Sequence, residues 1–265
     1  DVEAFDPEFA ATKSTRNIVE YYFTMSPVLP LFLFDRSTDI DMFTYLDSDL
    51  LFYADPAPVF EEMGDASLLL IEHRFPPELK YREKFGIYNL QFQPYRRDDN
   101  TATCLHWWRK SCIAWCYDRL EDGKFADQKY LEQWPDKFDG VHILKHRGAG
   151  LAPWNWSMYD LKLENDKMTV DGQELIFYHF QGFWILGGNF ISHNLGSYGH
   201  IMNKKLSEFF YADYYRRLLD AEAGLQNIPA AQGLTLRSKL QRAGFSRLRG
   251  YLSALKHHNL MRVKI

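Results

Sequence analysis

Residues 42–53 read Met-Phe-Thr-Tyr-Leu-Asp-Ser-Asp-Leu-Leu-Phe-Tyr, an apolar run that two carboxylates interrupt at Asp47 and Asp49. Such a run predicts a buried β-strand. Side chains at positions i and i+2 of an extended chain point to the same side. The two carboxylates would repel each other there and lose hydration unless a cation lies between them. The pattern therefore has two interpretations: a site for Mg²⁺ or Mn²⁺, which prefer such oxygen ligands, or an acidic turn after a strand.

The rest of the chain alternates predicted strands with predicted helices. Residues 66–72 read Ala-Ser-Leu-Leu-Leu-Ile-Glu, which predicts a central strand covered on both faces. Residues 85–94 alternate apolar and polar side chains, as a second strand would. Helices are expected at 13–34, 103–121 and 204–224, and further strands at 141–144 and 175–180. This alternation predicts an α/β domain.

The composition is that of a globular protein. A chain of 265 residues suits one large domain or a domain with an appendage. Apolar residues make up 46% and charged residues 25%, both ordinary values. The aromatic share of 16% is high. It fits a large aromatic core, and it is also compatible with the flat surfaces that bind carbohydrate.

The cysteines and the ends of the chain bear on location. Cys104, Cys112 and Cys116 are odd in number and predict buried free thiols in a reducing compartment. No apolar stretch reaches the roughly 18 residues of a transmembrane helix. The chain opens with acidic Asp1-Val2-Glu3, without an initiator Met, so we expect no signal peptide. These features predict a cytoplasmic protein and a chain that is part of a longer gene product.

Charge divides the chain into residues 1–224 and a C-terminal extension, residues 225–265. The extension holds eight of the 31 Lys and Arg residues and none of the 35 Asp and Glu residues. Its leucines recur at helical spacing. A basic amphipathic helix of this kind either docks on the acidic body or attracts an anionic membrane surface, so a peripheral contact with the inner membrane face is one expectation.

Three further blocks follow the Asp-x-Asp pair in a fixed order. They are Gly-Lys-Phe-Ala-Asp-Gln at 123–128, Leu-Ala-Pro-Trp-Asn-Trp at 151–156 and Tyr-His-Phe-Gln-Gly at 178–182. Asn89 lies in a predicted strand between the first acidic pair and these blocks. This ordered set, over residues 13–183, resembles the retaining sugar-nucleotide transferases of glycosyltransferase family 8, which include glycogenin and bacterial lipopolysaccharide galactosyltransferases.

The resemblance implies a GT-A-like fold, with a mixed, mostly parallel sheet flanked by helices. It implies that Asp47, Asp49 and His179 ligate Mn²⁺ (or Mg²⁺), which bridges the donor diphosphate and neutralises the leaving group. A site of two carboxylates and an imidazole suits Mn²⁺ somewhat better than Mg²⁺. From the residues alone, His179 could equally be a core histidine bonded to backbone.

The resemblance also implies donor-binding roles for Arg16, Asn89, Asp127, Gln128 and Gly182. Asp127 and Gln128 would be the catalytic pair that holds the donor sugar, with the amide of Gln128 beside the anomeric carbon. Because an amide is a poor nucleophile, the implied reaction is substitution on one face of the sugar, guided by the leaving phosphate. On the residues alone, Arg16 could be a solvated helix charge, Asn89 a sheet-edge residue and Asp127 a helix N-cap.

The chain departs from the family pattern in two places. The family usually has a Lys shortly after His-x-x-Gly, whereas Phe-Trp-Ile-Leu-Gly-Gly at 183–188 has none. Backbone N–H groups of Gly187 and Gly188 could bind phosphate instead. About forty residues precede the Asp-x-Asp pair, too few for the βαβ half that holds the nucleotide. We therefore expect that this N-terminal part is missing from the chain.

The leading hypothesis is a metal-dependent glycosyltransferase that moves a sugar from a nucleotide-diphosphate donor to a glycan, lipid-linked or protein acceptor with retention. Nothing in the sequence suggests nucleic-acid binding. A phosphoryl-transfer enzyme would also use paired carboxylates, but the chain has no Walker-type phosphate loop. A non-catalytic carbohydrate-binding or scaffold protein is the third alternative.

Overall fold

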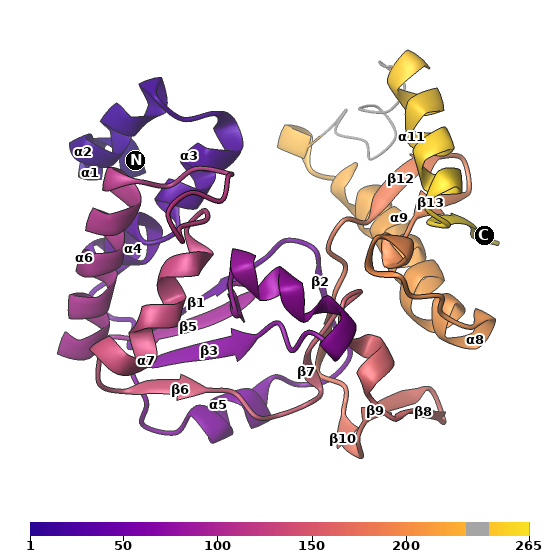
Figure 1. Ribbon diagram of the computed structural model, residues 1–265, viewed down its shortest axis with the longest axis horizontal. Coiled ribbons are helices and arrows are strands. Elements are labelled where there is room, and N and C mark those ends of the chain that lie inside the picture. The colour runs from indigo at the N-terminus through magenta and orange to yellow at the C-terminus, as the bar shows by residue number, and fades with distance from the viewer. Residues whose placement is uncertain (232–243, 265) are drawn as a thin grey trace.

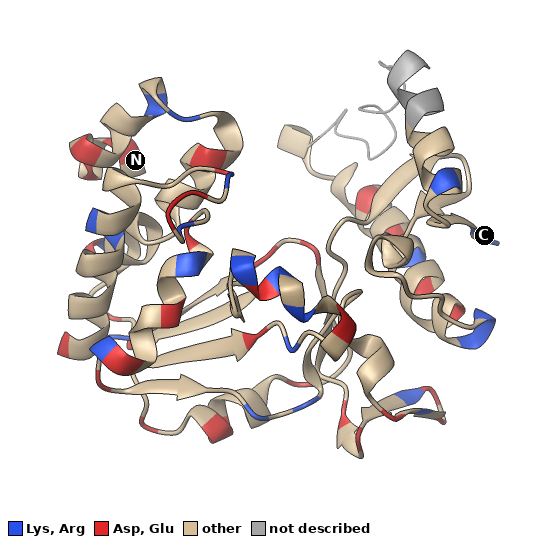
Figure 2. Ribbon diagram, viewed as in Figure 1, with Lys and Arg blue, Asp and Glu red and all other residues tan. Residues whose placement is uncertain are grey.

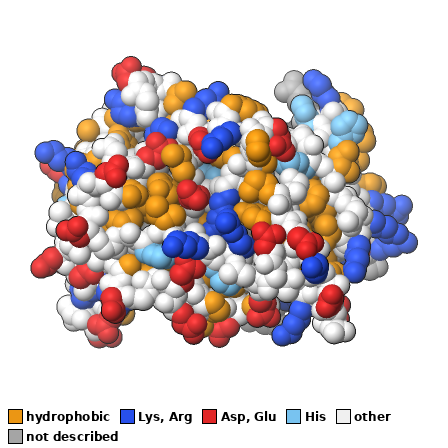
Figure 3. All heavy atoms as spheres, turned by 60° about the horizontal axis from the view of Figure 1, so that its bottom comes forward, with side chains coloured by type: hydrophobic (Ala, Val, Ile, Leu, Met, Phe, Trp, Pro, Cys, Tyr) orange, Lys and Arg blue, Asp and Glu red, His pale blue; other side chains and the backbone are white. Residues whose placement is uncertain are grey.

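The protein has a mixed α/β fold, seen in a computed structural model that describes residues 1–231 and 244–264 (Figure 1). Helices of the N-terminal region stand beside α6 (Asp99–Ala114) at one side of a central sheet. Smaller sheets and the C-terminal helices lie at the other side. Acidic and basic residues are interspersed along the described elements of both parts (Figure 2). On the face in Figure 3, apolar side chains reach the surface on both sides of a central group of Lys and Arg.

The N-terminal region consists of short helices. They are α1 (Val2–Phe5), α2 (Pro7–Ala11), η1 (Thr12–Ser14), α3 (Ile18–Met25) and α4 (Val28–Arg36). The single helix predicted at 13–34 is therefore wrong in its bounds. Asn17 begins α3 through a reciprocal capping box with Glu20, which satisfies the first free N–H groups. Pro27 separates α3 from α4 because its ring cannot continue the hydrogen-bond pattern of the preceding helix.

The central sheet is built around β3 (Leu68–Glu72), as predicted. Residues 68–71 have no exposed surface. Leu68 and Leu70 pack toward α6 and the segment formed by η3 (Gln128–Gln133) and α7 (Trp134–Lys137). Leu69 and Ile71 pack on the opposite side, against α5 (Ala57–Met63). This alternation buries both faces of the strand, which is why its sequence is apolar at successive positions.

Strand directions differ from the predicted mostly parallel sheet. Strand order is β1 (Met42–Leu46), β5 (Phe92–Arg96), β3 and β4 (Tyr88–Asn89), with β6 (Val141–Ile143) also paired to β3. Both β4 and β5 run antiparallel to β3, while β3 and β6 are parallel. The physical reason is one reversed strand: β5 lies between β1 and β3 and opposes both, so each of its pairs is antiparallel.

Three smaller sheets follow. The first contains β2 (Leu50–Phe52), β11 (Phe177–His179) and β7 (Ala149–Leu151), with β11 antiparallel to β2 and parallel to β7. The second contains β8 (Leu161–Glu164), β9 (Lys167–Val170) and β10 (Gln173–Glu174). The third contains β12 (Trp184–Gly187), β13 (Phe190–Ser192) and β14 (Leu260–Arg262). The adjoining helices are α8 (Lys204–Ser207), η6 (Glu208–Ala212), α9 (Asp213–Leu225) and α11 (Gly244–Lys256).

The predicted C-terminal extension contributes both a helix and a strand to the body. Strand β14 pairs with β13, and Val263 is fully buried in the core that contains Ile191 and Leu195. On α11, Ala254 is buried, while Leu252 and Leu255 are exposed. The rest of the predicted helical apolar face falls on residues 232–243 and on the side chains of residues 244–249, which lie outside the described part of the chain. Among the helices that are described, none is long and apolar enough to cross a membrane.

Replacing Val263 with Ala tests this integration. Loss of two buried methyl groups should lower the free energy of unfolding by roughly 1–3 kcal/mol, measured by urea denaturation. The neighbouring exposed Lys264→Ala variant is the control and should change stability by less than about 0.5 kcal/mol. Equal stabilities of V263A and the parent protein would contradict the packing of β14 onto the core.

Candidate metal and substrate site

The Asp-x-Asp pair lies in a turn where the chain leaves one sheet and enters another. Strand β1 ends at Leu46 in the central sheet, and β2 begins at Leu50 in the sheet that also contains β11 and β7. The run is half-buried rather than buried, because β1 is the edge strand of the central sheet among the described residues. The continuous buried strand predicted for residues 42–53 is therefore wrong, although both carboxylates do lie at strand ends.

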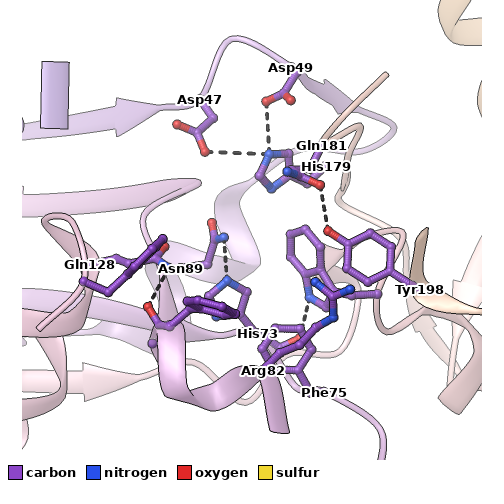
Figure 4. A pocket seen from close by; sticks show the side chains of 14 residues that line it. Asp47, Asp49, His73, Phe75, Arg82, Asn89, Gln128, His179, Gln181 and Tyr198 are labelled. Carbon is purple, nitrogen blue, oxygen red and sulfur yellow. Dashed lines mark hydrogen bonds and ion pairs between the residues drawn. The ribbon is translucent and has the colours of Figure 1, made fainter. Parts of the chain in front are cut away.

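His179 reaches this turn from β11. The antiparallel pairing of β11 with β2 aligns His179 with Leu50, and the N–H of Phe180 donates to the carbonyl of Asp49. His179 Nε2 lies 3.0 Å from Asp49 Oδ1 and 3.7 Å from Asp47 Oδ2 (Figure 4). One ligand atom from each of the three residues lies within 4.8 Å of the others. The structure thus brings together all three residues of the predicted metal site.

The other ring nitrogen of His179 is held by Gln91, whose Oε1 lies 3.0 Å from Nδ1. With Nδ1 donating to this amide oxygen, Nε2 of the neutral ring presents a lone pair toward both carboxylates. A lone pair facing two carboxylate oxygens is repulsive unless a proton or a metal ion lies between them. Asp47 also has an outer partner, because the hydroxyl of Tyr45 donates to its Oδ1 at 3.0 Å. Such outer hydrogen bonds are typical of metal ligands.

The electrostatics of the pair are unequal. Burial raises the pKa of Asp47, and the nearby imidazole only partly offsets this. Burial acts in the same direction on Asp49, but the hydrogen bond and positive charge that a protonated His179 ring supplies outweigh it and lower the pKa of Asp49. A divalent ion of magnesium size holds opposite ligands roughly 4.2 Å apart, so a small closure of the cluster would fit one. The donor set and its spacing therefore suit Mg²⁺ or Mn²⁺.

An interrupted strand positions the polar groups below this cluster. Strands β4 and β5 flank Leu90 and Gln91, where the backbone N–H of Gln91 donates to Asn89 Oδ1 at 2.7 Å. The carbonyl of Gln91 in turn accepts from the N–H of Asp47 at 3.0 Å. Asn89 Nδ2 lies 3.0 Å from His73 Nε2, and His73 Nδ1 lies 3.1 Å from the carbonyl of Ile87. Burial lowers the pKa of His73 to about 4, so this ring is a neutral, structural partner of Asn89.

A pocket of about 460 Å³ opens beside the cluster. Asp47, Asp49 and His179 lie at one end in Figure 4, and Arg82 and Phe75 lie at the other. The remaining lining residues are aromatic, amide or small: His73, Phe85, Gly86, Asn89, Phe125, Gln128, Trp154, Gln181 and Tyr198. Flat rings and amide groups are the chemistry that recognises a sugar, with the carboxylates supplying a place for a cation.

The predicted donor-binding residues divide into two groups. Asn89 and Gln128 line the pocket with the metal cluster, and Gln128 Nε2 donates to the carbonyl of Phe85 at 2.9 Å. Arg16 does not line it: its guanidinium lies 3.8 Å from the centre of the Tyr117 ring and bonds the carbonyl of Ile113. Gly182 lines a different cavity, where its positive φ and close contact with Asn194 exclude a side chain.

Asp127 lies next to Gln128 but is buried outside the lining of the pocket. It occupies the N-cap position of η3, as the alternative interpretation predicted, but its side chain makes no capping hydrogen bond. Its carbonyl accepts from the indole of Trp108, which ties this corner to α6. Burial raises the pKa of Asp127 to about 7, although a hydrogen bond from Ser26 offsets part of the effect, and the charge of Asp47 adds to it.

Sequence reasoning did not assign roles to His73, Arg82, Gln91, Trp154 or Tyr198. Two of them carried a usable signal. His73 directly follows the central strand, and Gln91 lies two positions from Asn89 in the strand predicted for residues 85–94, where their side chains would share a face. Trp154 belongs to the block at 151–156, which was used only as part of the family resemblance and not as a source of site residues. Arg82 and Tyr198 lie in ordinary polar stretches of the sequence, and nothing there indicated a functional role.

Fold and site together define a mixed α/β protein with a carboxylate–imidazole cluster at the mouth of an aromatic pocket. No family model matches the chain. It is 32% identical over 219 residues to the uncharacterized protein YfnD of Bacillus subtilis strain 168, covering 82% of this chain and 70% of YfnD. It is 34% identical over 185 residues to the uncharacterized protein YfnF of the same strain, covering 67% of this chain and 61% of YfnF. The chain belongs to the family of YfnD.

The raised pKa of Asp127 predicts a pH dependence of stability. Between about pH 4 and 7 the folded protein holds a proton that the unfolded chain has released, so stability falls as pH rises through this window. Replacing Asp127 with Asn removes this contribution. Relative to the parent protein, D127N should gain stability from pH 4 to 7, with a slope approaching about 1.4 kcal/mol per pH unit, and then level off.

The measurement is urea denaturation across this pH range, with EDTA present so that bound metal does not contribute. The exposed Asp139→Asn variant is the matched control and should follow the parent protein at every pH. A stability difference for D127N that stays constant from pH 4 to 8 would show that Asp127 is not perturbed.

Proposed function

We propose that the protein is a metal-dependent glycosyltransferase that uses a nucleotide-diphosphate sugar and retains the anomeric configuration. The observation that carries the proposal is the convergence of Asp47, Asp49 and His179 at one end of a pocket otherwise lined by aromatic and amide groups. A metal cluster alone would suit many reactions. The aromatic and amide lining of the adjoining pocket, which suits a sugar, and the order of the sequence blocks favour glycosyl transfer.

In this proposal the three clustered residues hold Mn²⁺ (or Mg²⁺). When bound, the ion neutralises the diphosphate and makes it a better leaving group. Gln91 fixes the tautomer of His179 so that Nε2 faces the ion, and Tyr45 orients the carboxylate of Asp47. Both supporting groups lie outside the ligand set. Their contribution is to keep the ligands in place before the ion and the donor arrive.

Gln128 and Asn89 are the proposed contacts of the donor sugar. Gln128 commits its Nε2 to the carbonyl of Phe85, while its Oε1 accepts no hydrogen bond from a described residue. An amide oxygen beside the anomeric carbon would stabilise the positive charge that develops there without forming a stable bond. Asp127 and Arg16 support this corner from outside the pocket lining. Their proposed roles are in positioning the residues around Gln128.

We further propose that the central sheet is the core of a GT-A-like domain. Support comes from β1, β3 and β6, which share one direction, with one reversed strand between β1 and β3. The acceptor in this proposal is a glycan, a lipid-linked sugar or a protein, and a peripheral membrane contact through the basic C-terminal segment fits the exposed Leu252 and Leu255. The alternative of a non-catalytic carbohydrate-binding protein would keep the pocket and dispense with turnover.

Replacing Asp49 with Asn tests the proposal. The substitution keeps the shape of the side chain but removes a charged ligand, so the affinity for Mn²⁺, measured by calorimetry, should fall by at least about tenfold. Turnover of a panel of nucleotide-diphosphate sugars should be lost in D49N. NMR of the product formed by the parent protein should show the anomer of the donor.

The exposed Asp41→Asn variant, just before β1, controls for the loss of one negative charge and should bind Mn²⁺ as the parent protein does. Failure of the parent protein to bind Mn²⁺ or Mg²⁺ would overturn the metal site. Metal binding without turnover of any donor in the panel would favour the non-catalytic alternative.

A further inference from the structure

The end of the pocket opposite the carboxylates contains a cation. Arg82 lies on η2 (Pro77–Phe85), a 3₁₀ helix that joins β3 to β4. Because such a helix has three residues per turn, Leu79, Arg82 and Phe85 share one face. Leu79 is buried, and both Arg82 and Phe85 line the pocket, whereas Lys80 and Lys84 are exposed. The periodicity of the helix thus selects Arg82 from three neighbouring cations.

Arg82 has no counter-ion. No carboxylate oxygen of a described residue lies within 4.0 Å of its guanidinium, although Arg109 and Lys129, also largely buried, both have one. Its Nη2 donates to the carbonyl of Ser197 at 3.0 Å, and its Nε is enclosed without a hydrogen-bond partner. A half-buried guanidinium normally has its donors satisfied by an anion or by carbonyl groups. The Nε donor of Arg82 has no such partner among the described residues.

Aromatic rings connect Arg82 to the metal cluster. The guanidinium lies 4.7 Å from the centre of the Tyr198 ring, and the Tyr198 and Trp154 rings are 6.0 Å apart. Trp154 contacts the His179 ring edge-to-face at 5.4 Å. Hydrogen bonds hold both linking rings: the indole of Trp154 donates to the carbonyl of His73, and the hydroxyl of Tyr198 donates to Gln181 Oε1. The wall between the two charged ends is therefore preorganised.

We propose that Arg82 and this aromatic wall form a subsite for an anionic sugar, one that carries a carboxylate or a phosphate. The planar guanidinium binds such groups through two parallel hydrogen bonds, while the ring faces of Trp154 and Tyr198 contact the sugar. The subsite lies apart from the carboxylates, which would repel the same anion. This proposal rests on the proposed function, because it assigns the substrate class of the same pocket.

Binding of two matched glycosides tests the subsite without requiring turnover. Methyl glucuronoside and methyl glucoside differ by one carboxylate, and ligand-observed NMR with Mg²⁺ present gives both dissociation constants. The parent protein should bind the glucuronoside at least about tenfold more tightly. Arg82→Gln should abolish this preference, Arg82→Lys should retain part of it, and the Mg²⁺ affinity of R82Q should be unchanged.

Lys84→Gln is the control, since Lys84 lies on the same helix, is exposed and does not line the pocket. It should keep the full preference. Equal binding of both glycosides to the parent protein, or a preference that survives in R82Q, would overturn the proposal. Absence of Mg²⁺ binding would count against the proposed function alone, because the glycoside ratio is measured independently.

A second experiment distinguishes the two carriers of the anion. Hydrolysis of UDP-glucuronic acid and UDP-glucose is compared in the parent protein and R82Q. If the donor carries the anion, R82Q slows hydrolysis of the glucuronic acid donor selectively. If the acceptor carries it, the ratio of the hydrolysis rates of the two donors is the same in both proteins, and the glucuronoside or glucose 6-phosphate accelerates transfer in the parent protein but not in R82Q. Acceleration by neutral glucose alone, equal in both proteins, would contradict the subsite.

Discussion

Gln91 holds together the parts of the protein on which the site depends. Its backbone carbonyl accepts from Asp47, its side-chain oxygen binds His179, and its N–H is bonded by Asn89. These contacts join the edge of the central sheet to the sheet that contains β2, β11 and β7. The side chain is fully buried, so each hydrogen bond is made where water cannot replace it. The pairing of β11 with β2 already places His179 beside Asp49, and Gln91 ties both to Asp47 at the end of β1.

Crowding beneath Gln91 shows how closely the two sheets approach. Gly150, at φ 91°, has no room for a side chain: a Cβ would lie 2.9 Å from Ile71 and 3.0 Å from the Gln91 amide nitrogen. That amide nitrogen has no hydrogen-bond partner. Buried unsatisfied groups in native proteins are uncommon and tend to occur at functional sites. The orientation of the amide is therefore set by the contact of its oxygen with His179, and both N–H donors of its nitrogen are left without a partner among the described residues.

The pocket places opposite charges at its two ends, separated by aromatic rings that hydrogen bonds hold in place. Such an arrangement orients a ligand that carries unlike groups, and it discriminates between ligands through the charge that each end repels. The elements that supply the two ends differ in character. Strand termini hold the carboxylates and the imidazole, while Arg82 is carried by a 3₁₀ helix between strands. Variation in that helix would change the charge at one end of the pocket without disturbing the cluster of Asp47, Asp49 and His179 at the other.

The amino-acid sequence by itself determined the central strand, from four consecutive apolar residues, and the pairing of Asp47 with Asp49 at the end of a strand, whereas the addition of His179 to that pair came only from the family resemblance. Both are local signals, because burial and charge repulsion act on neighbouring positions. The tertiary structure alone decided the antiparallel direction of β5, the contact of Gln91 with a residue 88 positions away, and the position of Arg82, which donates to the carbonyl of Ser197 and has no carboxylate partner among the described residues. The physical reason is that strand direction and counter-ion proximity depend on how separate elements pack. The same explains why Asp127 and Arg16, which resemble donor contacts in sequence, lie outside the pocket lining.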